Sequence, residues 1–305
     1  MRSFFGFLPV FLGCASLPPP AQYSGVFSEA KGVLVVYGDT RRLRFGESLV
    51  ESTRQRADRE RQEVARKVAE ESPDIVLHSG DLVKNGGDRE EWAIFDRETT
   101  AIRERGIAVY PALGNHDYEG DGTANFFARF PHLGGRKWYD LRYRGLLILV
   151  VDSNRNYLTR SEIEGQRKWY RERLSAAQSD GAIRCIMVIG HHAPYTNAVV
   201  FSDSEFVKEE FVEPAKRFPK LRAFFVGHIH SYERFLIEGV HYVVSGGGGA
   251  PMNEVRTGRR HADAYSGPRR FHYCRIRAGD TVQVEVIMLG EDGKWFQADS
   301  FAIFP

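Results

Sequence analysis

The sequence predicts an α/β fold in which buried strands form central sheets and helices cover them. Short apolar runs rich in Val, Ile and Leu alternate with longer charged stretches of helical periodicity. Five of the apolar runs lead directly into a polar motif, each of them through a glycine. The 305 residues, of which 42% are hydrophobic, suffice for one large α/β domain or two small ones. Collagen-like, coiled-coil and wholly disordered proteins are excluded.

The first 22 residues are typical of a targeting segment and a linker. Arg2 supplies a positive charge, and the apolar run over residues 4–12 is too short to span a bilayer. Residues 11–14 resemble the bacterial lipobox, in which the cysteine, here Cys14, becomes the lipidated first residue. A plain cleaved signal peptide with an incidental Cys14 is the alternative. Three prolines at 18–20 favour an extended spacer. We therefore expect an exported bacterial lipoprotein or periplasmic protein, with its folded domain over residues 31–305.

Charge and cysteine content restrict the classes of partner. The 42 Lys and Arg and 40 Asp and Glu leave a formal charge of +2, so no overall field attracts long nucleic acid. Beyond Cys14 only Cys185 and Cys274 remain, which excludes a framework of several disulfides. Any attraction to phosphate must be local, and any membrane contact is expected only through a lipid on Cys14.

The elements follow from these patterns in chain order. Strands are expected over residues 33–37, 74–78, 107–113, 183–189 and 221–226. Amphipathic helices are expected over 57–71, 88–106 and 161–177, the last opening on a capping box of Ser161 and Glu164. Two antiparallel strands, 271–276 and 281–288, follow with a turn at 277–280. They could belong to a second sheet or to a small appendage.

The polar motifs lie where the carboxyl ends of the strands would meet. Ligands bind at this edge of open α/β sheets, so five strand ends can converge on one site. Carboxylate, amide oxygen and imidazole are the ligand types of a hard or borderline divalent metal. In order, the motifs are Gly38-Asp39-Thr40-Arg41, Gly80-Asp81-Leu82-Val83, Gly114-Asn115-His116-Asp117, His191-His192-Ala193-Pro194 and Gly227-His228-Ile229-His230.

The ordered motifs resemble those of the calcineurin-like metallophosphoesterase family, over about residues 33–251. The resemblance implies a layered α/β sandwich of mixed sheets flanked by helices, with two divalent metal ions at the carboxyl ends of the strands. It implies that Asp81 bridges the ions and that His192, two residues before a proline as in the family, is the ligand of the fourth motif. The implied ligands are Asp39, Asp81 and His230 on the first metal, and Asp81, Asn115, His192 and His228 on the second.

The resemblance also implies a reaction. A hydroxide that bridges the metal ions would attack the phosphorus of a phosphomonoester or phosphodiester in line, without a covalent enzyme intermediate. His116 is the candidate acid for the leaving group, or a stabiliser of transition-state charge, and we expect Asp117 to hold it. The remaining histidines are expected to be structural, namely His78, His132, His191, His241, His261 and His272.

Two positions depart from the family pattern. Arg41 stands where the first motif usually has a histidine ligand, and arginine cannot be deprotonated to bind a metal. Arg41 either clamps a phosphate oxygen of the substrate or is a solvated loop residue. Lys84 replaces the metal-bound tyrosine of the related purple acid phosphatases, so the protein should not be purple. The donor sets allow Mn²⁺, Fe²⁺, Zn²⁺ or Mg²⁺.

The leading hypothesis is a hydrolase of a small phosphorylated substrate. Loops over residues 118–137 and 195–205 would contact its leaving group. The alternative is a binding protein at the cell surface or in the periplasm that keeps its metal but has lost catalysis, with Arg41 as the mark of that loss. A nuclease is the third option, disfavoured by the near-neutral charge.

Overall fold

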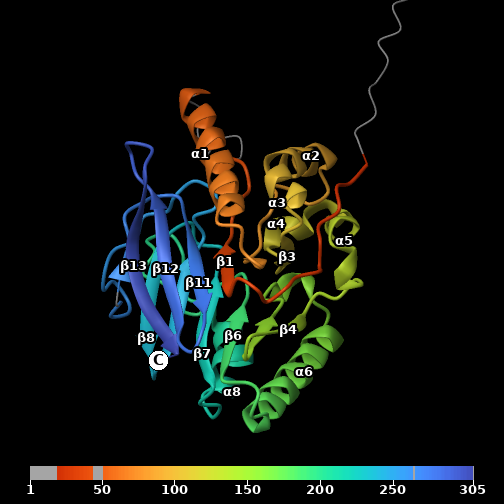
Figure 1. Ribbon diagram of the computed structural model, residues 1–305, viewed down its shortest axis with the longest axis vertical. Coiled ribbons are helices and arrows are strands. Elements are labelled where there is room, and N and C mark those ends of the chain that lie inside the picture. The colour runs from red at the N-terminus through yellow and green to blue at the C-terminus, as the bar shows by residue number, and fades with distance from the viewer. Residues whose placement is uncertain (1–18, 44–50, 264, 305) are drawn as a thin grey trace, which may run out of the picture.

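The computed structural model describes residues 19–43, 51–263 and 265–304 (Figure 1). The predicted targeting segment up to residue 18, including Cys14, lies outside these residues, so export and lipidation stay predictions. Among the described residues, no helix has the length and apolar character needed to cross a membrane.

Two mixed sheets form the centre of the molecule. The first has the strand order β13-β12-β11-β1-β2-β3, with β1, β2 and β3 parallel and the others antiparallel. The second has the order β10-β8-β9-β7-β6-β5-β4, in which β5, β6, β7 and β9 are parallel. Their bounds are β1 Val33–Tyr37, β2 Ile75–His78, β3 Ala108–Pro111, β4 Tyr139–Tyr143, β5 Leu146–Val150, β6 Cys185–Ile189, β7 Leu221–Val226, β8 Tyr232–Ile237, β9 Val240–Ser245, β10 Tyr265–Ser266, β11 His272–Ala278, β12 Val282–Leu289 and β13 Trp295–Phe304.

Helices lie outside the sheets and complete the layered sandwich. In Figure 1, α2 to α6 lie on the side of the molecule opposite the antiparallel strands β11 to β13. Residues of both sheets share one large hydrophobic core. The helices are α1 Glu51–Glu70, α2 Arg89–Glu98, α3 Thr100–Glu104, α4 Asn115–Tyr118, α5 Thr123–Arg129, α6 Arg160–Ser179, α7 Glu205–Val207 and α8 Glu213–Ala215, with short turns η1 Glu119–Asp121, η2 Pro131–Leu133, η3 Arg155–Tyr157 and η4 Lys208–Val212.

The structure confirms the α/β sandwich and corrects two helix predictions. The helix expected over 88–106 is broken at Thr99, which separates α2 from α3. Helix α6 is capped by Thr159 and Glu162, whose side chains exchange hydrogen bonds with each other's backbone N–H, so the predicted box of Ser161 and Glu164 is wrong. The sequence carries the same Ser/Thr to Glu spacing twice, and the box lies at the earlier position.

The strands at the end of the chain extend the first sheet and are no appendage. Strand β11 pairs with β1, and β12 pairs with β11. Strand β13 closes this edge and also reaches the second sheet, because Asp299 accepts hydrogen bonds from Tyr232 and Arg234 of β8 at 2.7 and 2.8 Å. The last third of the chain therefore ties the two sheets together.

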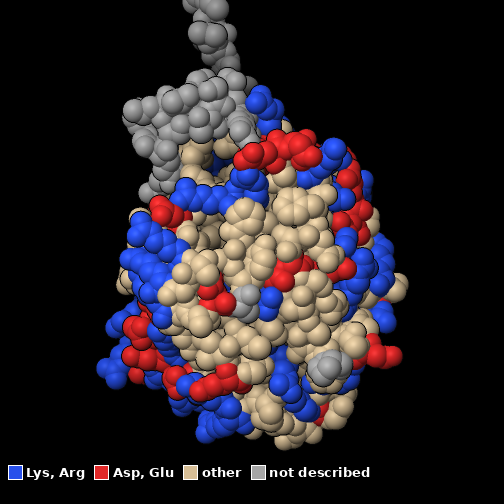
Figure 2. All heavy atoms as spheres, turned by 90° about the vertical axis from the view of Figure 1, so that its left-hand side faces the viewer, with Lys and Arg blue, Asp and Glu red and all other residues tan. Residues whose placement is uncertain are grey.

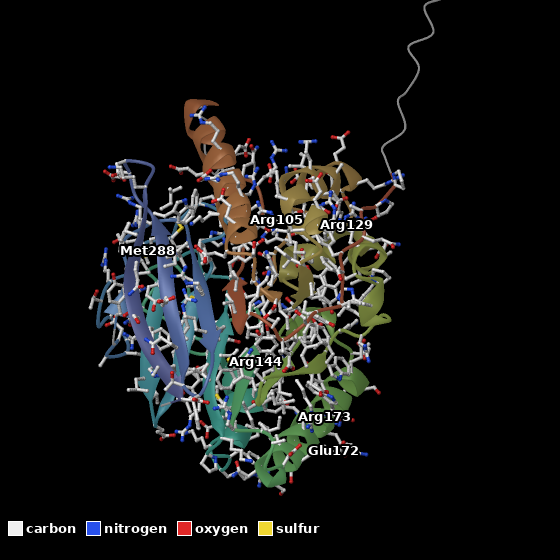
Figure 3. All side chains as sticks on the ribbon, viewed as in Figure 1. Arg105, Arg129, Arg144, Glu172, Arg173 and Met288 are labelled. Carbon is white, nitrogen blue, oxygen red and sulfur yellow. The ribbon has the colours of Figure 1, made fainter. Side chains whose placement is uncertain are left out.

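A buried ion pair holds α5 against α2, on either side of the loop that carries the third motif. Arg129, which is labelled in Figure 3, donates to Asp96 from Nε and Nη2 at 2.9 and 2.7 Å. Its guanidinium lies 4.6 Å from the centre of the Trp92 ring. A bidentate, aromatic-covered arginine fixes both helices more firmly than a surface pair would.

We expect His272 in β11 to make stability depend on pH. Its Nδ1 donates to the Arg270 carbonyl, its Nε2 is buried without a hydrogen-bond partner, and burial lowers its pKa to about 4. The unfolded chain therefore binds the proton more readily, so stability is present above the ordinary pKa and falls as the pH drops toward 4. From pH 7 to pH 5 the loss is about 2 kcal/mol.

Urea unfolding at both pH values checks this expectation. His272→Gln should lose less stability than the wild type between pH 7 and pH 5, whatever its stability at pH 7. Equal losses in the two proteins would contradict the assignment.

Candidate metal centre

The predicted ligands come together where the carboxyl ends of both sheets meet. Asp39, Asp81 and Asn115 follow β1, β2 and β3 of the first sheet. The histidines of the fourth and fifth motifs follow β6 and β7 of the second sheet. Two sets of side chains have ligand atoms that all lie within 4.8 Å of one another, namely Asp39, Asp81 and His191, and His191, His192 and His228. The site is therefore built by two sheets.

Backbone strain concentrates on three of these residues. Asp39, Asp81 and His228 have φ values of 60°, 56° and 68°, in the left-handed region that side chains with a Cβ rarely adopt. Such conformations persist at functional sites, where the surrounding structure enforces them. Here each one turns a side chain from the end of a strand toward the common centre.

Glycines allow the motif loops to touch. A Cβ at Gly114 would lie 2.2 Å from Asp81 Oδ1, and one at Gly227 would lie 2.3 Å from Asp39 Oδ2. Neither position can therefore carry a side chain without moving a carboxylate. This explains physically why glycine precedes Asn115 and His228.

Asp117 joins the second motif to the third. Its buried carboxylate accepts backbone N–H groups of Asp81 at 2.9 Å and Gly114 at 2.8 Å, and further N–H groups of Leu82 and Val83. The expectation that Asp117 holds His116 is therefore wrong, since backbone amides surround its carboxylate. Its role is to fix the loop that presents Asp81 and Asn115.

His116 reaches the site by another route. Its Nδ1 lies 2.8 Å from the Lys84 carbonyl, to which it donates, and 3.3 Å from Glu119 Oε1. Its Nε2 lies 3.7 Å from Asp81 Oδ2. The ring is thus oriented with one nitrogen toward the centre, as a proton donor to a leaving group requires.

Carbonyl acceptors fix the tautomers of two histidines. His191 Nδ1 donates to the Ser79 carbonyl at 2.8 Å, and His230 Nδ1 donates to the Pro251 carbonyl at 2.7 Å. In the neutral ring, Nε2 then carries a lone pair, which is how metal-binding histidines are usually oriented. His230 Nε2 lies 3.6 Å from Asp39 Oδ1, in line with its predicted place beside Asp39.

The two adjacent histidines of the fourth motif differ in which ring nitrogen is free to bind a metal. Ser153 Oγ accepts the backbone N–H groups of His191 and His192, at 3.2 and 2.9 Å, which uses both of its lone pairs. Its hydroxyl can then donate to His192 Nδ1, 2.9 Å away, in the tautomer of His192 that carries its hydrogen on Nε2. In that tautomer, Nε2 has no lone pair for a metal. His191, which the sequence assigned a structural role, has one.

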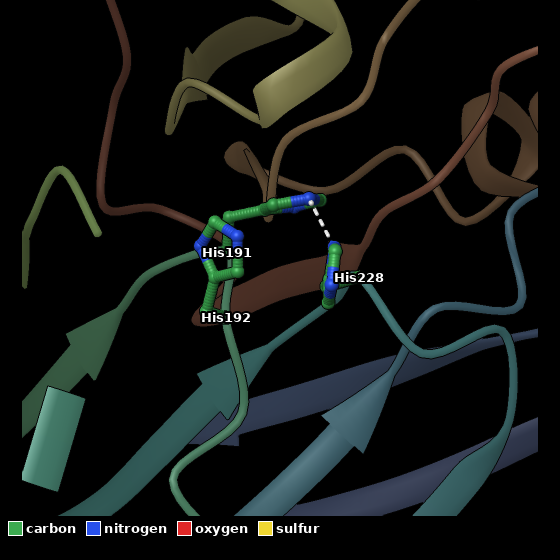
Figure 4. A group of neighbouring side chains, drawn as sticks. All are labelled: His191, His192 and His228. Carbon is green, nitrogen blue, oxygen red and sulfur yellow. Dashed lines mark hydrogen bonds between the residues drawn. The ribbon is translucent and has the colours of Figure 1, made fainter. Parts of the chain in front are cut away.

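His191 points into the middle of the cluster. Its side chain is fully buried, and its Nε2 lies 3.1 Å from Asn115 Oδ1, 3.3 Å from His228 Nδ1 and 3.4 Å from Asp81 Oδ1. Figure 4 shows the three histidines, with the dashed line joining His191 to His228. A lone pair that faces an amide oxygen and a carboxylate is stable only if a cation, either a proton on Nε2 or a metal ion, lies between them.

The electrostatics of the carboxylates also suit a cation. Burial raises the pKa of Asp39 above its usual range, and the charge of Asp81 adds to the effect. Burial alone would also raise the pKa of Asp81, but His191, His116 and His228 outweigh it and hold this pKa at about 2. Two buried carboxylates this close repel each other, and a divalent ion reverses that repulsion. The donor set thus fits a divalent metal.

Burial also keeps two of the histidines neutral. It lowers the pKa of His192 to about 3, helped by the charge of His191, and lowers the pKa of His228 well below its usual range. Neutral imidazole is the form that binds metals. His228 is further held by its backbone N–H, which donates to Asp39 Oδ2 at 3.0 Å.

Arg41 is part of the buried site. Only 6% of the residue is exposed, and its charge lowers the pKa of Asp39 against the effect of burial. Its backbone N–H donates to the Asp81 carbonyl at 3.2 Å. The solvated-loop alternative is therefore wrong.

Sequence reasoning missed the end of β5. There Asp152 accepts hydrogen bonds from Tyr118 and Asn154, and Ser153 positions the fourth motif as described above. An apolar run precedes these residues, as it precedes the other motifs, but no glycine marks the boundary. A rule based on the apolar run alone would have found them.

Comparison with known proteins agrees with this geometry. Comparison with curated proteins gives no match. Purple acid phosphatase PPD1 from yellow lupin (Lupinus luteus) seeds has a similar solved structure, with a TM-score of 0.69 at 19% identity, over 93% of this chain and 55% of the lupin chain. This chain therefore spans about half the length of that enzyme.

Two further solved structures match over most of both chains. GAP50 of Plasmodium has a TM-score of 0.66 at 12% identity, covering 89% of this chain and 88% of its own. A dimetal phosphatase from Danio rerio has a TM-score of 0.60 at 11% identity, covering 94% and 99%. At these identities the likeness establishes the fold.

The sequence model of calcineurin-like phosphoesterases matches residues 32–232, about two thirds of the 305 residues. The matched segment contains all five motifs, from Asp39 to His230, and every strand that delivers them. The chain belongs to the calcineurin-like phosphoesterase family.

Proposed function

We propose that the protein hydrolyses phosphate esters with the help of two divalent metal ions. The observation that carries the proposal is the buried contact among three acceptor atoms, in which Asn115 Oδ1 and Asp81 Oδ1 lie 3.1 and 3.4 Å from His191 Nε2. A metal ion satisfies all three at once. The residues that would hold the ions are Asp39, Asp81, Asn115, His191, His228 and His230, with His191 in place of the expected His192.

The protein's own side chains have separate tasks in this reaction. Bound ions would supply an activated water and positive charge for the phosphoryl oxygens. His116, held by the Lys84 carbonyl, would give a proton to the leaving oxygen. His192, with its hydrogen on Nε2, would donate a hydrogen bond to a phosphoryl oxygen. Arg41 would add charge from the Asp39 side.

The enzyme is favoured over the metal-bound binding protein. GAP50 is described as the anchor in the inner membrane complex of Plasmodium, so a fold of this kind alone does not define an activity. In this chain, however, the carboxylate, amide and imidazole groups are all present, and they point toward a common centre.

A small substrate suits the surface. Figure 2 shows one face of the molecule, on which Lys and Arg side chains are interspersed with Asp and Glu around a broad neutral area. A long polyanion would need a continuous basic stripe. The described part of the face in Figure 2 shows no such stripe, and together with the net charge of +2 this favours a small phosphorylated molecule as the substrate.

Hydrolysis of nitrophenyl esters by protein stripped of metal and resupplied with Mn²⁺ tests the proposal. We expect metal-dependent turnover of 4-nitrophenyl phosphate or of bis(4-nitrophenyl) phosphate. Asn115→Ala should lower kcat/KM on the order of 10² to 10³-fold, because it removes an oxygen from the centre. Asn125→Ala is the matched control, since Asn125 of α5 donates to the Gly86 carbonyl and is no ligand.

The contrary result is also informative. If folded protein loaded with Mn²⁺, Fe²⁺, Zn²⁺ or Mg²⁺ turns over neither ester, the result favours the metal-bound binding protein, and Arg41 becomes the first position to examine.

A further inference from the structure

The loop over residues 195–204 places an aromatic ring beside the metal centre. Phe201 lies edge-on to His228, with 5.1 Å between the ring centres and 69° between the ring planes. On its other side His228 contacts Asn115 Oδ1 through Nδ1 at 3.1 Å. Phe201 thus contacts a member of the proposed ligand cluster directly.

Two carboxylates, one of them fully buried, hold this loop in place. Glu233 of β8, fully buried, accepts the Thr196 hydroxyl at 2.8 Å and the Asn197 backbone N–H at 2.6 Å. Asp203 accepts the Thr196 backbone N–H at 3.0 Å and is paired with His261 at 2.7 Å. Both ends of the loop are therefore anchored to the body of the protein.

The segment after the glycine-rich loop supports the middle of the same loop. Ala198 forms a bridge with Val255, and the Val199 N–H donates to the Glu254 carbonyl at 2.9 Å. Arg259 donates to the carbonyls of Ala198 and Val199 at 2.5 and 2.6 Å. Phe201 is therefore presented from a backbone that is fixed on both sides, as a preformed binding wall requires.

The tip of the loop is apolar although it faces solvent. Val200 is 72% exposed, and Phe201 is half-buried against a small apolar cluster that includes Ala193 and Val226. A purely structural role for Phe201 would not need Val200 beside it in water. An exposed apolar side chain and a half-buried aromatic ring beside the polar ligand cluster can together form the rim of a ligand-binding site.

We propose that Phe201 determines specificity by binding an apolar or aromatic part of the leaving group. The inference rests on the proposed function, because that function places the phosphoryl group at the centre beside His228. The leaving group of an ester bound there extends past the residues that border the ligand cluster. On the side of His228, the residue at this border is Phe201. An aromatic ring gains both buried area and an edge-to-face contact from the phenyl ring.

Binding of two phosphonates, which cannot be hydrolysed, tests the proposal by calorimetry on the Mn²⁺-loaded protein. Benzylphosphonate carries an aromatic group, whereas methylphosphonate carries only the anionic head. Phe201→Ala should weaken benzylphosphonate about three- to tenfold and leave methylphosphonate within about twofold. Phe201→Tyr should keep the preference of the wild type for benzylphosphonate.

Phe206→Ala is the matched control. Phe206 lies five positions further along the chain and packs against Phe211, with ring centres 6.2 Å apart, so both phosphonates should bind it as they bind the wild type. Equal weakening of both phosphonates by Phe201→Ala would mean that Phe201 only supports His228, and no weakening would mean that it does not meet the ligand. Either result overturns the inference.

The two proposals fail separately. If the wild type hydrolyses nitrophenyl esters but Phe201→Ala leaves the ratio of the two affinities unchanged, only the specificity inference is lost. If the wild type turns over no ester yet binds benzylphosphonate through Phe201, only the hydrolytic function is lost. Binding of neither phosphonate by the metal-loaded wild type overturns the specificity inference as well.

Discussion

Asp81→Ala should lower kcat/KM for phosphate esters on the order of 10³-fold or more, and should remove at least one bound metal ion. Asp81 faces both sides of the centre, with Oδ1 3.4 Å from His191 Nε2 and Oδ2 3.7 Å from His116 Nε2. The surrounding histidines keep its pKa at about 2 despite burial, so it is ionised before any metal arrives. Metal content by mass spectrometry and steady-state kinetics measure the two effects.

Asp74→Ala is the matched control at the opposite end of β2. Asp74 is also buried, but it accepts the Gly32 N–H at 3.0 Å and the Tyr143 hydroxyl at 2.6 Å, away from the ligands. Its loss leaves these donors unpaired, so the variant should be destabilised by about 1 to 3 kcal/mol with its metal content intact.

The stability of the metal-free protein should also fall when Asp81 is removed. Asp81 raises the pKa of its neighbour Asp39, but the histidines around it hold its own pKa at about 2, below the usual value, so its ionised carboxylate stabilises the fold at pH 7. Without metal, Asp81→Ala should therefore be less stable than the wild type at pH 7. If Asp81→Ala retained both ions and full activity, the assignment of Asp81 as the bridge would be wrong.

Local sequence signals were sufficient to predict the strands that precede the motifs. Apolar runs before Asp39, Asp81, Asn115 and His228 predicted both the strand ends and their convergence, because a parallel strand presents its last residues at a common edge. Other strands were not predicted because they contain polar residues. Strand β8 carries Glu233 and Arg234, whose partners Thr196 and Asp299 are distant in sequence. Only the folded chain explains why polar side chains stand there.

The sequence identified a ligand by its residue number only where the motif offered a single candidate residue. The pair His191 and His192 offered two, and the spacing to Pro194 selected the second. Our proposal of the first depends on hydrogen bonds to Ser79 and Ser153, and neither serine is near the pair in sequence. Likewise, the sequence does not show that the carboxylate of Asp117, next to His116, accepts hydrogen bonds from backbone N–H groups.

His191→Ala and His192→Ala therefore form a pair whose effects should differ by about 10²-fold. His191→Ala should lose one metal ion per chain and lower kcat/KM on the order of 10³-fold, because the lone pair on its Nε2 is lost from a fully buried position. His192→Ala should keep both ions and lower kcat/KM about tenfold, through loss of one hydrogen bond to the phosphoryl group.

The two substitutions are adjacent and equal in size, so a general effect on folding would appear in both. Metal content separates the roles before any activity is measured, because a ligand changes the number of bound ions and a hydrogen-bond donor does not. If His192→Ala were the variant that loses the ion, then the Ser153 hydroxyl must accept from His192 and not donate to it, and the ligand expected from the spacing to Pro194 would be correct. The tautomer at Ser153 thus decides which histidine completes the metal centre.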